Sequence, residues 1–385
     1  MAQAKGSAAQ VLIDFETTYG ADPTSKIGYS MPFNYPFDLK ASRPLKQAGT
    51  HRGNRNAAMP FYGNRDVRGS ATVPVDRIAT GYWLRALLGA PNTSWAVAKA
   101  INNAAAVDKS GGLVGIPITS HAFVAGEPVT IAGSTNYNGN NTVVSKTTNE
   151  IVITAAYVAE TFSGSTCRTQ LRTHVFKPAT AIESMVVETG FTNISQFFKF
   201  NGVKLSKYAV DFGGDSELVA KLDLMGASET PGATQYATPT AIAFTRFHNR
   251  QLTFLEGGSA MALIKGGSFA IANDLDGESI AANGDTRFDL PEGDCMVNGA
   301  FKLFFQDRTL YDIAAAGTER SFQVLLTDGV YSLAFLFPEI LYTIETPTIV
   351  KGGVYADFTF EGYYEDAASA AAVVATLINA QAAYV

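Results

Sequence analysis

Two distant parts of this chain repeat each other, which limits the folds that are open to it. A run that begins at Val67, VRGSATVPVDRIATGYWLRALLG, is similar to one that begins at Val297, VNGAFKLFFQDRTLYDIAAAG. Each run has a strand pattern followed by a short helix pattern, which stops at Gly89 in the first copy and at Gly317 in the second. Repeats of this length predict two structural units of the same kind.

A second pair of repeats follows the first. FKFNGVKLSKYAVDF begins at Phe198 and FLFPEILYTIETPTI begins at Phe335, and each copy ends in one more alternating strand, from Val219 or Tyr355. The first pair is separated by 230 positions (297 − 67) and the second by 137 (335 − 198). The first copy therefore carries 93 extra residues (230 − 137) between Gly89 and Phe198, which we interpret as an inserted domain.

Strand patterns dominate both units. Apolar and polar side chains alternate over residues 218–225 and 354–361, as in strands with one packed and one solvent-facing side. Helices are predicted near residues 76–88 and 307–316, and a third in the alanine-rich stretch 367–385. The expected fold is mainly β, with two tandem homologous β-barrel or sandwich domains, one short helix in each, and a small inserted all-β domain.

The predicted domain boundaries follow from the repeats and from changes in composition. An Asn138-Gly139 turn between short β patterns indicates an all-β insert, and about 65–75 residues suffice for such a module to fold without disulfides or metals. The turn-rich run TPGATQYATPT indicates a linker between the units. We expect a first domain over residues 1–95 and 176–228, an inserted domain over 96–175, a linker over 229–240 and a second domain over 241–385 that ends in the C-terminal helix.

Composition argues against two classes of partner. The net charge is −6, so the chain as a whole does not favour a polyanion. Residues 367–385 carry no charge, but they are mostly alanine and too weakly hydrophobic for a membrane span. We therefore predict a docking helix capped by Asp366 and no membrane partner. Cys167 and Cys295 lie in different units, and one bridge between them stays possible, although a reduced state is favoured.

The sequence predicts no catalytic, cofactor or metal site. It lacks the common nucleotide-binding and nucleophile motifs, and its four histidines show no metal-ligand spacing. Gly213-Gly214 recurs as Gly352-Gly353, which favours a turn in each repeat over a phosphate cradle. Residues 273–278 are similar to part of a calcium loop but lack its full ligand set, so a solvated acidic loop is favoured.

The two units differ in charge at one matching stretch. Residues 40–68 hold seven basic residues and one acidic residue, whereas residues 274–294 hold seven acidic residues and one basic residue. Chance composition is one explanation, and charge complementarity between neighbouring subunits is the other. Binding of nucleic acid by the basic stretch is less favoured, because Phe61 and Tyr62 lie at one end of it. The candidate contacts between subunits are Lys40, Arg43, Lys46, Arg52, Arg55, Asp274, Asp276, Glu278, Asp285 and Asp289.

This layout resembles the tail tube proteins of long-tailed bacteriophages, in the branch where two tube domains are fused in one chain. The resemblance is carried by the strand and helix run from Val67, by the paired strands from Phe198 and Phe335, and by the duplication itself. It covers both units outside the insert. It implies a virion structural protein with no enzymatic activity and no cofactor, present in the host cytoplasm before assembly.

The resemblance also implies a mechanism of assembly. Three fused chains would close into a homotrimeric, pseudo-sixfold ring, and rings would stack into a hollow tube that holds the tape-measure protein first and passes DNA later, without sequence-specific binding. A long loop of each domain, here residues 29–64 and 271–291, would reach the adjacent ring, and terminator and baseplate proteins would meet the tube ends. The insert would decorate the outside. Strand alternation makes four acids candidates for the lumen: Asp211, Asp223, Asp357 and Glu361.

Two other functions stay open on the sequence. Another tail component, such as a terminator or a baseplate hub, would use similar domains. A tail-associated enzyme that degrades polysaccharide is less favoured, because it needs two acids that converge in a cleft. The acids of this chain cluster on one loop whose repeat counterpart is basic, which suits assembly better than hydrolysis.

Overall fold

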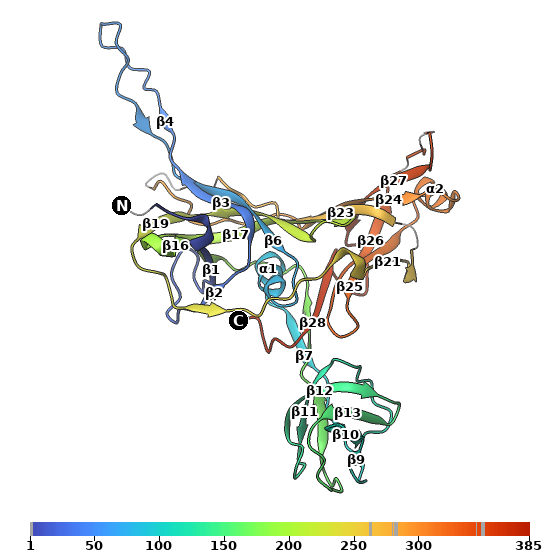
Figure 1. The fold of residues 1–385 in the computed structure, drawn as a ribbon. Helices are drawn as coiled ribbons and strands as arrows, with labels where there is room; N and C mark the ends of the chain where they lie inside the picture. The colour runs from blue at the N-terminus through green and yellow to red at the C-terminus, as the bar shows by residue number, and fades with distance from the viewer. Residues whose placement is uncertain (1–2, 262–263, 279, 281–283, 344, 348–350) are drawn as a thin grey trace.

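The computed structural model describes residues 3–261, 264–278, 280, 284–343, 345–347 and 351–385. As predicted, the fold is mainly β: it has one large mixed sheet, a separate seven-stranded sheet and two short α-helices within the described residues. In Figure 1 the large sheet forms a wide body, with helix α1 beneath its upper layer and the separate sheet below.

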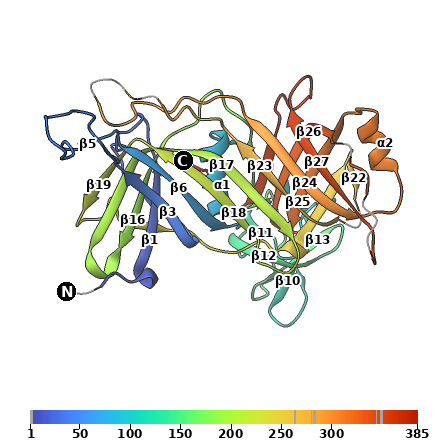
Figure 2. The same ribbon diagram turned by 90° about the horizontal axis from the view of Figure 1, so that it is seen from above.

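The upper layer of the body is a continuous run of seven strands, each antiparallel to the next. Figure 2 looks down on this layer. The strands, in spatial order, are β3 (Asn34–Ser42), β6 (Asp66–Pro74), β18 (Val219–Gly226), β17 (Gln196–Gly213), β23 (Ile264–Ala272), β24 (Met296–Phe304) and β27 (Tyr355–Tyr363).

The strand pairing repeats along with the sequence. Ser70 of β6 pairs with Asp223 of β18, and Ala300 of β24 pairs with Thr359 of β27. These partners are shifted by 230 positions (300 − 70), the offset of the first repeat pair, and by 136 positions (359 − 223), the offset between the closing strands that begin at Val219 and Tyr355 (355 − 219). The two halves of the chain thus build the same ladder from matching residues.

A bulge recurs at the matching place in the outer strands. The register between β16 and β17 shifts between Met185 and Val187, and the register between β25 and β26 shifts between Arg320 and Phe322. On the far side, β1 pairs with β16 as β21 pairs with β25. These outer strands are β1 (Ala9–Phe15), β2 (Gly28–Ser30), β16 (Met185–Phe191), β19 (Ser228–Gly232), β20 (Pro239–Ala241), β21 (Leu252–Glu256), β22 (Ser259–Ala260), β25 (Arg320–Thr327) and β26 (Ser332–Tyr342).

The helices predicted near residues 76–88 and 307–316 are present, but they differ in burial. All ten residues of α1 (Ala79–Leu88) are buried, whereas in α2 (Thr309–Ala315) only Ala314 is buried among the described residues. Asp76 stabilises the start of α1 from the preceding turn, because its Oδ1 accepts hydrogen bonds from the N–H groups of Ile78 (2.8 Å) and Thr80 (3.2 Å). The difference in burial arises because α1 lies inside the body, while α2 lies at its outer end (Figure 1).

The predicted C-terminal helix is wrong. Its central residues form strand β28 (Val374–Asn379), which pairs with β26 on one side and with β15 (Arg172–Phe176) on the other. Val373, Ala375 and Leu377 are fully buried at alternate positions, which is the spacing of a strand. The predicted linker also contains regular structure. Residues 228–232 form β19, which pairs with β17, and residues 239–241 form β20, which pairs with β2.

The segment predicted as an insert folds around a core of its own. Its core side chains include Val114, Ile131 and Phe162, and Cys167 lies among them as a free thiol. β7 (Asn92–Trp95) pairs with β15, and β15 belongs to the main sheet, although the predicted insert extended to residue 175. The strands of the separate sheet are β8 (Lys99–Ala100), β9 (Val107–Asp108), β10 (Leu113–Pro117), β11 (Pro128–Ala132), β12 (Gly139–Lys146), β13 (Glu150–Thr154) and β14 (Thr166–Thr169).

Candidate assembly surfaces

The four acids predicted for a lumen lie on one face of the seven-stranded layer. Along β17, β18 and β27 the alternate residues Tyr208, Leu222 and Phe358 are buried on the side of α1. Their exposed neighbours point the other way, because successive side chains of a strand alternate between faces. The four acids on this outward face are Asp211, Asp223, Asp357 and Glu361.

Basic residues balance the acids on this face. Lys221 Nζ lies 2.7 Å from Asp211 Oδ2, and the hydrogen bond and charge of Asp211 raise the pKa of Lys221. The side chains of this pair and of the Lys302–Asp357 pair are 43–63% exposed. Such exposed ion pairs add little to the stability of the fold. By strand register the outward face carries the acids Asp38, Asp66, Asp211, Asp223, Asp357 and Glu361, and the bases Lys40, Arg68, Lys207, Lys221 and Lys302. The face is therefore close to neutral, and four ion pairs join its charges: Lys40–Asp38, Arg68–Asp66, Lys221–Asp211 and Lys302–Asp357.

One junction joins the two repeats into a single layer. The end of β17 pairs with β23 from Lys207–Ala272 to Gly213–Gly266. Next to this ladder the ring of Phe212 lies 4.9 Å from that of Phe254. Gly213 has a φ of 102°, and a Cβ there would lie 2.6 Å from Gly266 Cα, so the turn interpretation of the repeated glycines holds at this position.

The two oppositely charged stretches connect matching strands. The basic stretch lies between β3 and β6, where β4 (Leu45–Lys46) and β5 (Phe61–Tyr62) form an arm, and the acidic stretch joins β23 to β24. Much of the predicted loop 29–64 is strand, since β3 occupies residues 34–42. Residues 279 and 281–283 of the predicted loop 271–291 lie outside the described residues.

The two stretches contact each other within one chain. Arg43 Nη2 lies 3.2 Å from Asp285 Oδ2, and the N–H of Arg65 donates to the carbonyl of Asp285 (2.7 Å). Arg287 is 4% exposed, pairs with Asp66, and donates to the carbonyl of Gly226 (3.1 Å). Partial burial would raise the pKa of Asp66, but the hydrogen bond and charge of Arg287 lower it on balance. Part of the opposite charge is thus used inside the chain.

The acidic stretch is also fastened to the body. Buried Lys204 Nζ lies 2.7 Å from Glu292 Oε1 and 3.7 Å from Asp289 Oδ1. The side-chain amide of buried Asn273 donates to the carbonyls of Leu87 (2.9 Å) and Leu205 (3.0 Å). Asn273 therefore acts as a donor that anchors the loop, which is the opposite of a calcium ligand.

A family model settles the kind of protein. The model described as "Phage tail tube protein" matches residues 6–362. The chain belongs to the phage tail tube protein family. It is accordingly a non-enzymatic structural protein of the tail tube, located in the phage tail, and tail tube proteins self-assemble. A comparison with curated proteins found no match.

Within this tail tube protein the remaining predicted contact residues are spread out. Lys40 lies on the outward face of β3, whereas Lys46, Arg52 and Arg55 are exposed along the arm that leaves the body in Figure 1. Asp274, Asp276 and Glu278 lie where the acidic stretch begins. Of the predicted set, the structure brings Arg43 to Asp285.

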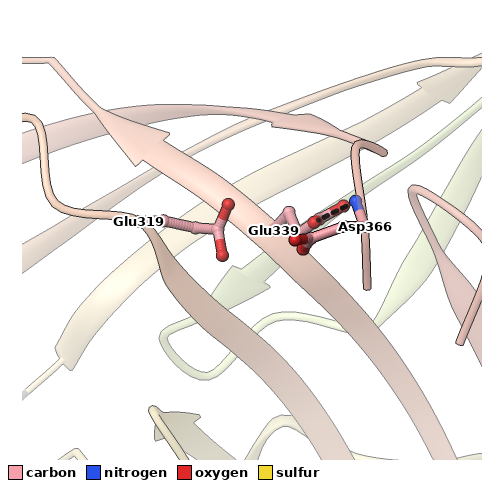
Figure 3. A group of neighbouring side chains, drawn as sticks. All are labelled: Glu319, Glu339 and Asp366. Carbon is pink, nitrogen blue, oxygen red and sulfur yellow. Dashed lines mark hydrogen bonds between the residues drawn. The ribbon is translucent and has the colours of Figure 1, made fainter. Parts of the chain in front are cut away.

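Three acids of the tail tube protein come close together at the end of β27. Figure 3 shows Glu319, Glu339 and Asp366, which offer carboxylate oxygens within 4.8 Å of one another. Buried Glu339 accepts the N–H groups of Glu365 (2.7 Å) and Asp366 (2.9 Å), and desolvation, which would raise its pKa, is outweighed by these hydrogen bonds, which lower it. Glu339 thus stabilises the turn before β28, which replaces the predicted capping role of Asp366.

The sequence reasoning missed the junction at Phe212. The signal was present, because Tyr208, Val210 and Phe212 alternate to the very end of the strand repeat. An apolar residue that ends an alternating strand beside Gly213-Gly214 indicates packing beyond the local hairpin. Among the described residues, no helix of this tail tube protein combines the length and the apolar character that crossing a membrane requires.

Proposed function

We propose that three copies of this chain close into a ring of six similar tube domains, and that such rings stack into the tail tube. The two domains are residues 1–95 with 176–228 and residues 241–385, joined by 229–240 and interrupted by the insert 96–175. The observation that carries this proposal is the β17–β23 junction, which already joins two repeat units side by side in one sheet.

The two ends of the seven-stranded layer hold the counterparts of the strands that form the internal junction. β3 pairs with β6 on one edge, and its other edge has no strand partner among the described residues. At the opposite end lies the counterpart of β17, strand β26, with β27 beside it. When β26 of one copy extends the sheet toward β3 of the next copy, the exposed strand edges disappear and the ring closes.

The burial of the helices supports the same arrangement. α1 is fully buried because the second repeat unit and the C-terminal tail cover it, whereas α2 occupies the matching place at the open end. In the proposed ring the first unit of the next copy covers α2. Each copy would then bury the surface around α2 at its outer end, just as it already buries the equivalent surface around α1 at its internal junction.

In this ring the outward face of the seven-stranded layer lines the lumen. Its mixed acidic and basic charges give a tape-measure protein, and later DNA, no continuous basic surface to bind. The separate seven-stranded sheet lies on the opposite side of the body (Figure 1), which supports a position of the insert on the tube exterior. The arm and the acidic stretch then meet the adjacent ring, and terminator and baseplate proteins meet the tube ends.

Native mass spectrometry and negative-stain microscopy of the purified protein test this function. We expect a species of three times the chain mass of 40.9 kDa, seen as rings with threefold symmetry and as hollow tubes at higher concentration. A protein that stays monomeric at all concentrations, or rings of six chains, would contradict the proposal. Rings that never stack would favour a terminator over a tube subunit.

A further inference from the structure

An apolar groove of about 500 Å³ lies beside the open edge strand β3. It is bounded by β1, β3, β16 and β17, and its walls include Val11, Phe37, Leu39 and Phe198. Tyr35 stands at its rim and is 66% exposed. The groove is therefore open to solvent in the single chain, and it adjoins the edge at which the proposed ring joins two copies.

The same place in the second repeat unit is filled by a side chain from the first. Phe212 of β17 lies across the ladder from Gly267 of β23, and its ring is 4.9 Å from Phe254 and 6.5 Å from Phe269. Gly267 fits between this ring and the neighbouring strand, because a Cβ there would lie 2.3 Å from the carbonyl oxygen of Ala300 and 2.9 Å from Cε2 of Phe212. One inserted aromatic side chain thus completes this part of the internal junction.

The groove and the filled cleft are built from matching positions. By strand register, Phe37 and Leu39 of β3 correspond to Gly267 and Phe269 of β23, since both pairs differ by 230 positions (267 − 37 and 269 − 39). Val11 of β1 corresponds to Phe254 of β21 by strand register, because Val11 pairs with Thr189 of β16 and Phe254 pairs with the matching residue Val324 of β25. All three counterparts of the residues around Phe212 line the groove.

We propose that this groove receives an apolar side chain from the second repeat unit of another copy, as the internal cleft receives Phe212. The proposal rests on the ring described above and names the contact that closes it. Because Phe37 stands where the filled cleft has Gly267, the groove fits an aliphatic side chain better than an aromatic one. In the repeat alignment the position of Phe212 is held by Ile349 (349 − 212 = 137), which lies outside the described residues.

A substitution inside the groove tests the contact. Phe37→Asp places a charge in the apolar socket, so the concentration needed for half-maximal ring formation should rise by at least about tenfold. Tyr157→Asp, at an exposed aromatic residue of the insert, is the control and should leave assembly unchanged. If the wild type forms trimers and Phe37→Asp forms them equally well, the groove contact is wrong while the ring stands. If the wild type forms no trimer, the ring itself fails.

A size swap and a cross-link protect the test against simple misfolding. Ile349→Phe alone should weaken assembly, and the double variant with Phe37→Gly should recover it by copying the Phe212–Gly267 pair. A photoreactive benzoylphenylalanine in place of Tyr35 should link to the peptide of residues 331–363 from a different copy, as shown by mixing light and heavy isotope-labelled chains. Links to the arm or the insert, or within one chain only, would overturn the proposal.

Discussion

The ring of Tyr384 lies directly against the α-carbon of Gly81 and leaves no space there for a Cβ. Tyr384 is 4% exposed, and its hydroxyl donates to the carbonyl of Ile78 (3.0 Å) and accepts from the side-chain amide of Asn379 (2.6 Å). The last residues of the second repeat unit are thereby anchored at the start of α1 in the first. This contact adds to the β17–β23 ladder that joins the two units.

We predict that Gly81→Ala destabilises the protein although alanine favours helix formation by about 1 kcal/mol. The new methyl group would displace the Tyr384 ring, for a net loss of about 1–3 kcal/mol. Urea denaturation measures the loss, and limited proteolysis should show earlier cleavage near the C-terminus. Adding Tyr384→Ala to Gly81→Ala should cost less than the two separate losses combined, and full additivity would contradict the contact.

Asp76 should make stability depend on pH. Burial raises its pKa to about 6, against the hydrogen bonds from Ile78 and Thr80, and its Oδ2 has no hydrogen-bond partner among the described atoms. The folded state therefore holds the proton more tightly than the unfolded state does. The resulting stability is fully present below pH 3.8 and is lost as the pH rises through about 6.

The expected loss attributable to Asp76 is about 3 kcal/mol at most. Asp76→Asn keeps a cap acceptor and removes the charge, so its advantage over the wild type should grow between pH 4.5 and pH 7.5. Chemical denaturation of both proteins at these two pH values measures the difference, and all other acids cancel in the comparison. If the unfolding free energies of the two proteins change in parallel with pH, the buried charge of Asp76 does not destabilise the fold.

Reversal of the basic residues of the arm to Glu (Arg43, Lys46, Arg52 and Arg55) should weaken assembly more at low salt than at high salt. Because Arg43 already pairs with Asp285 inside the chain, its reversal also loosens the base of the arm. The double variant Arg52→Glu with Arg55→Glu isolates contacts between copies, since both residues are exposed on the arm. Equal tube yields across a salt series, measured by sedimentation, would contradict complementarity between copies.

Compensation should follow when the acidic partner is reversed as well. Changing both sides in one chain should restore part of the tube yield at low salt, whereas either side alone should not. The full variant reverses Arg43, Lys46, Arg52 and Arg55 to Glu and Asp274, Asp276, Glu278 and Asp285 to Lys.

Trp95 should hold the insert in a fixed orientation. The guanidinium groups of Arg168 and Arg172 both lie over its ring, with their Cζ atoms 4.0 and 3.9 Å from the ring centroid, and its Nε1 donates to the carbonyl of Thr169 (2.6 Å). Trp95→Ala removes stacking worth about 1–2 kcal/mol, so the insert should vary in orientation while assembly is retained. Small-angle scattering of the unassembled protein should show a larger maximum dimension. An unchanged profile would mean that the β7–β15 pairing alone fixes the insert.

Local pattern was a good guide wherever a segment's structure depends on its own residues. The alternation over residues 218–225 predicted a strand with one buried face, and the starts at Asp76 and Asp307 predicted both helices. The repeat offsets predicted an extra segment, and that segment has a core of its own. These features follow from side-chain period, caps and turns, which act within a few residues.

The sequence by itself thus determined a mainly β chain with repeated strands, two short helices and an extra β module. Tertiary structure alone decided that residues 374–379 form a strand, because an alanine-rich run takes the geometry that its neighbours β15 and β26 offer for pairing. Tertiary structure also decided that Asp285 forms an ion pair with Arg43 of the same chain, and that the ring of Phe212 packs against Phe254 and Phe269 of the second repeat unit. Such contacts depend on which strand edges come together, and that is set by packing between segments far apart in the chain.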